Sequence, residues 1–102
     1  MKIIIIGCGK VGRTLAQQLN EEQHDIVLVD TNAEKLQEVT EEIDAMTLVG
    51  NGASIGVQKE AGVEDADMLI AITNSDELNL LCCLIAKKVS KCETVARVRN
   101  PI

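Results

Sequence analysis

The chain has 102 residues, a hydrophobic content of 46 % and a formal net charge of −6 at pH 7, which is typical of one small globular domain. The acidic balance argues against a nucleic-acid partner and against docking on anionic lipid, because both need clustered Lys and Arg. The chain has no Phe, Tyr or Trp, so no aromatic ring is available to stack on a base.

Apolar runs along the chain predict the strands of a parallel sheet. Residues 3–6 form a continuous apolar run, as expected for a strand that is buried on both faces. Further runs follow at residues 26–29, 46–49, 68–73 and 94–98. Helical segments separate these runs, and the alternation predicts right-handed crossovers with helices on both faces of the sheet. We therefore expect an α/β fold, a Rossmann-like doubly wound parallel sheet of order 3-2-1-4-5.

The helical segments carry apolar residues at three- and four-residue steps. Asn32 and Ser54 are predicted N-caps of the second and third helices, and Gly62 is the predicted stop of the third. The fourth helix is predicted over residues 77–89, after turn and cap residues at 73–76. Its apolar stripe is predicted to be Leu78, Leu81, Cys82, Ile85 and Val89.

Two features suggest that residues 1–102 are a single domain cut from a longer chain. A complete six-stranded fold needs one more helix and strand, so the fifth strand is expected at an exposed edge or under a partner. Leu80 and Leu84 widen the apolar face of the fourth helix, which favours contact with another subunit or the missing part, or else wide burial within the domain. No signal peptide or 18-residue apolar span is present, which predicts a cytoplasmic protein without direct membrane insertion.

A glycine motif follows the first strand and opens the first helix. In Gly7-x-Gly9-x-x-Gly12, Gly7 would allow the tight turn, Gly9 would let the backbone approach a pyrophosphate, and Gly12 would let the helix pack against the strand. Free N–H groups and the helix dipole favour an anion there. The motif predicts a nucleotide site, and the alternative is a purely structural turn.

Asp30 lies 18 residues after Gly12, at the predicted end of the second strand. Its carboxylate would accept hydrogen bonds from adenosine ribose hydroxyls and would repel a 2′-phosphate, which favours NAD or an adenine nucleotide over NADP. The alternative is a turn or N-cap acid.

Other candidates lie at the ends of later strands. Asn51 and Gly52 are placed to meet the adenine side of a nucleotide, or to form a plain turn. Thr73 and Asn74 follow the fourth strand at the point where strand order reverses, so they would meet the second half of a dinucleotide or cap the next helix. Arg97 and Arg99 share one face of the fifth strand and need partners, either a phosphate or a carboxylate such as that of Asp76 or Glu77. Arg97 is favoured for the ligand role, whereas solvent exposure near a strand end is the alternative.

Reactive groups are sparse. Cys8 lies at a helix N-terminus that would lower its thiol pKa, so a redox role is one interpretation and a small loop residue is the other. Cys82 and Cys83 are predicted to pack, and His24 is predicted to be a solvated turn residue far from the glycine loop. The cysteine spacing does not indicate a zinc site.

Several segments together resemble the N-terminal nucleotide-binding domain of Trk-type potassium-uptake regulatory proteins, called the KTN or RCK (regulator of potassium conductance) domain. The segments are MKIIIIGCGKVGRTLAQQL, VLVDTNAEKL, LVGNGAS, AGVEDADMLIAITNSDELNLLCCLIAKK and VARVRNP. By matching motif, the resemblance implies ligand contacts at Gly7, Cys8, Gly9, Lys10, Val11, Asp30, Asn51, Gly52, Thr73, Asn74 and Arg97.

The resemblance also implies a function. It describes a regulatory subunit that binds NAD(H), or alternatively ATP/ADP or AMP, without reacting it. Such a subunit assembles as a homo-oligomer, a dimer or ring, at the inner face of the membrane beside a potassium transporter or channel. The rival interpretations are the cofactor half of an NAD-dependent dehydrogenase and a domain that has lost its ligand.

Overall fold

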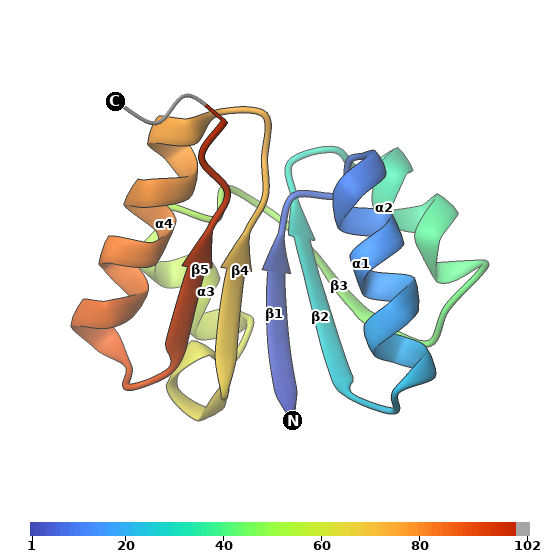
Figure 1. Ribbon diagram of the computed structural model, residues 1–102, viewed down its shortest axis with the longest axis horizontal. Helices are drawn as coiled ribbons and strands as arrows, with labels where there is room; N and C mark the ends of the chain where they lie inside the picture. Colours follow the sequence, from blue (N-terminus) through green and yellow to red (C-terminus); the bar gives the residue numbers. More distant parts are fainter. Residues whose placement is uncertain (100–102) are drawn as a thin grey trace.

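The computed structural model describes residues 1–99 as an α/β sandwich around one parallel sheet (Figure 1). The sheet has five strands in the order β3-β2-β1-β4-β5, and every neighbouring pair is parallel. The strands are β1 (Lys2–Ile6), β2 (Asp25–Asp30), β3 (Met46–Val49), β4 (Met68–Ala71) and β5 (Glu93–Ala96). The fold class and strand order predicted from the sequence are therefore confirmed.

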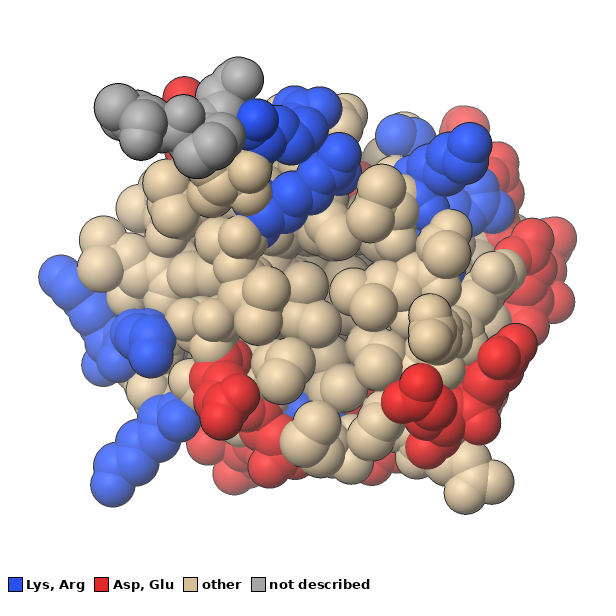
Figure 2. All heavy atoms as spheres, in the orientation of Figure 1, with Lys and Arg blue, Asp and Glu red and all other residues tan. Residues whose placement is uncertain are grey.

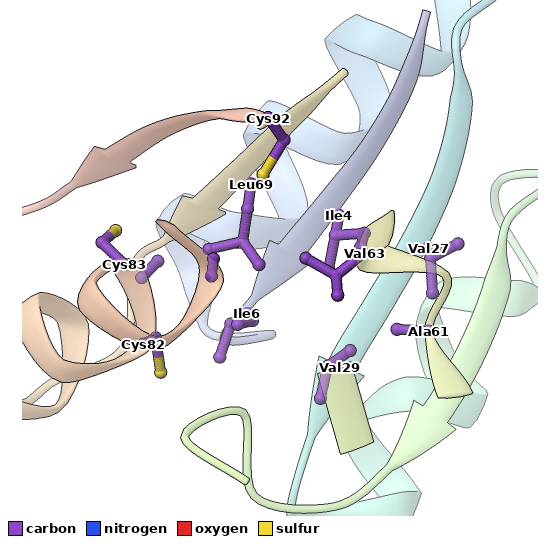
Figure 3. Packing of buried hydrophobic residues seen from close by; sticks show 12 residues of the cluster. Ile4, Ile6, Val27, Val29, Ala61, Val63, Leu69, Cys82, Cys83 and Cys92 are labelled. Atoms are coloured by element: carbon purple, nitrogen blue, oxygen red, sulfur yellow. The ribbon is translucent and has the colours of Figure 1, made fainter. Parts of the chain in front are cut away.

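Helices cover both faces of the sheet. The helices are α1 (Lys10–Glu21), α2 (Ala33–Thr40), α3 (Ile55–Glu60), the 3₁₀ turn η1 (Val63–Asp65) and α4 (Asp76–Val89). Alternate residues of β1 face opposite ways: Ile3 and Ile5 pack with α1 and α2, while Ile4 and Ile6 pack with α3, η1 and α4. Figure 3 shows the second of these layers, in which Leu69 and the β1 side chains lie between α4 and η1.

The predicted helix starts are confirmed by their N-caps. The side-chain oxygens of Asn32, Ser54 and Ser75 accept hydrogen bonds from backbone N–H groups three residues on, at 3.1, 3.3 and 3.1 Å. Gly62 follows α3 with φ +90°, a left-handed conformation in which a side chain is strained. The helix α2 ends at Thr40, so Ile43 packs against the core from the turn that follows it.

Two strands are shorter than predicted. β4 ends at Ala71 instead of residue 73, and β5 ends at Ala96 instead of residue 98. Beyond these ends, the Thr73 N–H and the Arg97 carbonyl bond the side chain of Asn79 on α4, at 2.8 and 2.9 Å. The Thr73 N–H and the Arg97 carbonyl are thus diverted from the sheet, although the Arg97 N–H still donates to the Ala71 carbonyl at 3.0 Å. Asn100 and Pro101 of the VARVRNP motif lie outside the described residues.

The predicted buried stripe of α4 is wrong in part. The buried face of α4 consists of Asn79, Cys82, Cys83 and Ala86, which recur at three- and four-residue steps. Leu81 is exposed together with Leu80 and Leu84. Small side chains on the inner face let α4 lie close to the sheet, and the leucines are left on the outside.

Candidate functional site

A cavity of about 530 Å³ opens at the carboxyl edge of the sheet, between the ends of β1 and β4 where strand order reverses. Crevices at such switch points are the usual ligand sites of open α/β sheets. The structure brings together all but one of the residues predicted from the sequence. The lining includes Gly7, Cys8, Gly9, Lys10, Val11, Asp30, Asn51, Gly52, Thr73, Asn74 and Arg97, whereas Gly12 lies behind the loop.

The glycine loop has the geometry predicted for a tight strand-to-helix turn. Gly7 has φ +113°, and a Cβ there would lie 2.9 Å from the backbone of Ile72 and Thr73. A Cβ on Gly12 would lie 2.1 Å from the Gly7 carbonyl oxygen, so α1 approaches the turn too closely for a side chain. A Cβ on Gly9 would meet nothing within 4 Å, because Gly9 faces the open cavity.

The N-terminus of α1 faces this cavity without a side-chain cap. Gly9 is the N-cap residue, no side chain of residues 1–99 bonds the free N–H groups of the first turn, and that turn carries no acidic residue. Lys10 and Val11 in this turn line the cavity. The N-terminus of α1 therefore presents free N–H donors and the positive end of its dipole to a ligand in the cavity.

Asp30 supports the loop as well as facing the cavity. Its Oδ2 accepts the Cys8 N–H at 2.7 Å, and its Oδ1 accepts the Asn32 N–H at 2.8 Å. A carboxylate has about four acceptor positions, so two remain for a ligand. Asp30 can therefore stabilise the turn and still have acceptor positions for a ribose, so the two interpretations of this residue are compatible.

The opposite wall is built by the turn after β3. Asn51 Oδ1 accepts the Ala53 N–H at 2.9 Å, as in an Asx turn, which supports the plain-turn alternative for the shape of this segment. A Cβ on Gly52 would lie 2.3 Å from the Ile6 side chain, so packing against β1 also requires glycine here. Both residues nonetheless line the cavity.

Thr73 lies at the switch point with its polar groups bound to α4. Asn79 Oδ1 accepts the Thr73 N–H at 2.8 Å and its hydroxyl at 2.6 Å, and Asn79 Nδ2 donates to the Thr73 carbonyl at 3.2 Å. Ser75 caps α4, which agrees with the alternative interpretation that this segment caps the next helix. Thr73 therefore contributes to the shape of the wall, and its hydroxyl proton is already engaged.

The two arginines near β5 have different surroundings. Arg99 is exposed, its guanidinium lies 3.8 Å from Asp76 and it also donates to the Asn74 carbonyl. Arg97 is half-buried in the cavity wall, and within residues 1–99 its guanidinium forms no ion pair. The Arg97 guanidinium in the cavity wall is thus available to pair with an anionic ligand.

Lysines complete the basic character of this edge. Lys10 and Lys35 line the cavity, and Lys35 was missed in the sequence because it is an ordinary exposed helix residue. The sequence did carry a signal for Lys35, because it lies in the first turn of α2, five residues after the acid that ends β2. Figure 2 shows Lys and Arg atoms along the upper edge of the molecule, where the strands end, although the chain is acidic. The local charge favours an anionic ligand.

The predicted lowering of the Cys8 pKa is wrong. Burial raises the pKa of the Cys8 thiol, and the neighbouring Asp30 carboxylate raises it further. Cys8 is buried and its Sγ lies 3.7 Å from the Lys35 carbonyl, so it behaves as a small loop residue. His24 lies before β2 at the opposite edge of the sheet, beside the chain amino group at 3.1 Å.

Comparison with known proteins identifies relatives that match almost the full length of this chain. The family model of the TrkA-N domain matches residues 3–102. The Trk system potassium uptake protein TrkA of Halomonas elongata is 49 % identical over 100 residues, which cover 97 % of this chain and 22 % of that protein. The chain therefore spans about a fifth of the length of this relative.

Solved structures give the same fold. The GsuK channel bound to NAD matches 98 % of this chain and 18 % of its own, with a TM-score of 0.86 and 26 % identity. The Kef C-terminal domain of Shewanella denitrificans in its AMP-bound form matches 98 % of this chain and 60 % of its own, with a TM-score of 0.84 and 21 % identity. Among residues 1–99, no helix has the length and apolarity needed to cross a bilayer.

Proposed function

The chain belongs to the TrkA-N domain family, and from that premise we propose that residues 1–102 form a nucleotide-binding regulatory domain of a potassium-uptake system. In this proposal the cavity at the carboxyl edge binds NAD(H), with ATP/ADP or AMP as alternatives, and the domain senses the nucleotide without reacting it. The observation that carries the proposal is the convergence of the uncapped α1 N-terminus and the Asp30 carboxylate on one cavity.

Each part of a nucleotide has a matching group. The N–H groups of the α1 first turn and the Arg97 guanidinium suit phosphates. The free acceptor positions of Asp30 suit ribose hydroxyls, and a 2′-phosphate beside this carboxylate would be repelled. The turn at Asn51 and Gly52 suits the adenine side, while Thr73 and Asn74 suit the second half of a dinucleotide.

The residues of the cavity wall favour a domain that binds the nucleotide without reacting it. The titratable residues of the cavity wall are Cys8, Lys10, Asp30, Lys35 and Arg97. The Cys8 thiol is buried and its pKa is raised, which disfavours a thiolate nucleophile, and the Asp30 carboxylate holds the backbone N–H groups of Cys8 and Asn32. The dehydrogenase alternative lacks a comparable supporting observation within residues 1–99.

The whole-protein role follows from the relatives and is part of the proposal. The regulatory subunit would act in the cytoplasm at the inner face of the membrane, as a homo-oligomer beside a membrane potassium transporter or channel. Two nucleotides would regulate that partner only if they favour two arrangements of the subunit to different degrees. The exposed leucines of α4 offer an apolar surface for assembly.

Isothermal titration calorimetry with a panel of nucleotides tests the binding proposal. We expect NADH, NAD⁺ or an adenine nucleotide to bind, and NADPH to bind at least about tenfold more weakly than NADH because of its 2′-phosphate. Equal affinity for NADH and NADPH would remove Asp30 as the selector. Absence of heat with every nucleotide would contradict the proposed function.

A further inference from the structure

Two buried amides lie between the cavity and α4. Among residues 1–99, Gln58 and Asn79 are the fully buried polar side chains, with 1 % and 0 % of their surface exposed. Burying an amide is unfavourable unless its groups are hydrogen-bonded, so the partners of these two side chains show what they hold in place.

Asn79 connects α4 to one wall of the cavity. Its Oδ1 accepts the N–H and hydroxyl of Thr73, and its Nδ2 donates to the carbonyls of Thr73 and Arg97, at 3.2 and 2.9 Å. The backbone donors and acceptors define which end of the amide is oxygen. A single side chain thus holds the ends of β4 and β5 in a fixed position relative to α4.

Gln58 connects α4 to the other wall. From α3, its Nε2 donates to the Gly52 carbonyl at 2.8 Å and to the Cys82 carbonyl of α4 at 2.9 Å. Its Oε1 is buried and has no hydrogen-bond partner among the described residues. An unsatisfied buried acceptor is destabilising, so the Oε1 of this glutamine does not contribute to the stability of the fold.

We propose that Asn79 and Gln58 are positioning residues that transmit the state of the cavity to α4. This inference rests on the proposed nucleotide-binding function. Thr73 and Arg97 lie on one wall and Gly52 on the other, so a wall that moves around a ligand must either break buried hydrogen bonds or carry α4 with it. The outer face of α4 exposes Leu80, Leu81 and Leu84, so a shift of α4 moves the apolar surface that a second subunit would contact.

Hydrogen exchange of α4, with and without saturating NADH, tests this inference on the complete chain. In the unmodified chain, NADH should slow the exchange of α4 amides by about fivefold or more. A fivefold effect corresponds to about the weakest coupling that is usual between two linked sites. Asn79→Ala would leave several buried groups unpaired, and its folding is at risk. Gln58→Met keeps the volume and removes the unsatisfied oxygen together with the two Nε2 hydrogen bonds, so it leaves fewer buried groups unpaired than Asn79→Ala and serves as the test.

Gln58→Met should still bind NADH and lose a measurable part of the protection of α4, because only the Asn79 connection remains, whereas Lys59→Met, on the exposed side of the same helix, should retain it. Binding together with full α4 protection in Gln58→Met would overturn the inference and leave the proposed function standing. Failure of the unmodified chain to bind any nucleotide would overturn the proposed function and the inference with it.

Discussion

The backbone N–H of Cys8 donates a hydrogen bond of 2.7 Å to Oδ2 of Asp30, which joins the glycine loop to the end of β2. The acid proposed to recognise ribose therefore also fixes the loop proposed to bind phosphate. The proposed ribose contact and the proposed phosphate loop are therefore linked by a hydrogen bond, and a substitution of Asp30 affects both of them.

Asp30→Asn should weaken binding of an adenine nucleotide by roughly 10- to 100-fold, because it replaces a charge-assisted contact worth about 1.5–3 kcal/mol. The matched control is Asp25→Asn, at the other end of the same strand, which should bind like the unmodified chain. Calorimetry measures both.

A double cycle separates the ribose contact of Asp30 from its support of the loop. AMP and 2′-deoxy-AMP should differ in affinity for the unmodified chain, and that difference should shrink in Asp30→Asn. If the difference between the two ligands were the same in both chains, Asp30 would not contact the ribose 2′-hydroxyl.

Arg97→Gln should lower the affinity for NADH by about tenfold or more and flatten its dependence on salt, because a charged group in the cavity wall is lost. Arg99→Gln is the matched control, since Arg99 is exposed and paired with Asp76. The check is a titration at two salt concentrations. Equal losses in both variants would assign the effect to overall charge instead of to the site.

The outer face of α4 should mediate self-association. Leu80 and Leu84 are 53 % and 56 % exposed and lie one turn apart on α4, so they form an apolar patch on its outer face. Sedimentation should show concentration-dependent association that Leu80→Glu with Leu84→Glu abolishes. Met46→Glu, at the far edge of the sheet, is the control and should associate normally. A strict monomer at high concentration would contradict the prediction.

The free energy of unfolding should depend on Cys82 at alkaline pH. Burial raises the pKa of this thiol from 9.0 to about 11, so the folded state favours the neutral form. The resulting stabilisation is fully present below pH 9 and is lost as pH rises from about 9 to about 11. Urea unfolding over this range should show a smaller decline for Cys82→Ala than for the unmodified chain, and parallel declines would contradict it.

The glycine loop and the strand order follow from local signals that tertiary contacts do not override. A continuous apolar run before Gly7 and helical periodicity after Gly12 place the turn, and the alternation of strands and helices gives the topology. The resemblance to the potassium-uptake regulatory proteins is confirmed over the same segments.

The inner face of α4 was not predictable in the same way. Sequence hydrophobicity favours Leu81 as a buried residue, but the close approach of α4 to the sheet selects small side chains such as Cys83 and Ala86. Asn79 and Gln58 look like ordinary polar helix residues in the sequence. Their roles depend on backbone groups of Thr73, Arg97 and Gly52 that come into reach only in the folded chain.

Amide chemical-shift mapping by NMR, with NADH titrated into the unmodified chain, tests the central claim most directly. The account predicts saturable shifts at the amides of Gly9 to Val11, at Asn32 and at Gly52, which line the cavity, and none at His24 or Asp67 on the opposite edge of the sheet. Shifts confined to the opposite edge, or no saturable shifts with NADH or any adenine nucleotide, would contradict it.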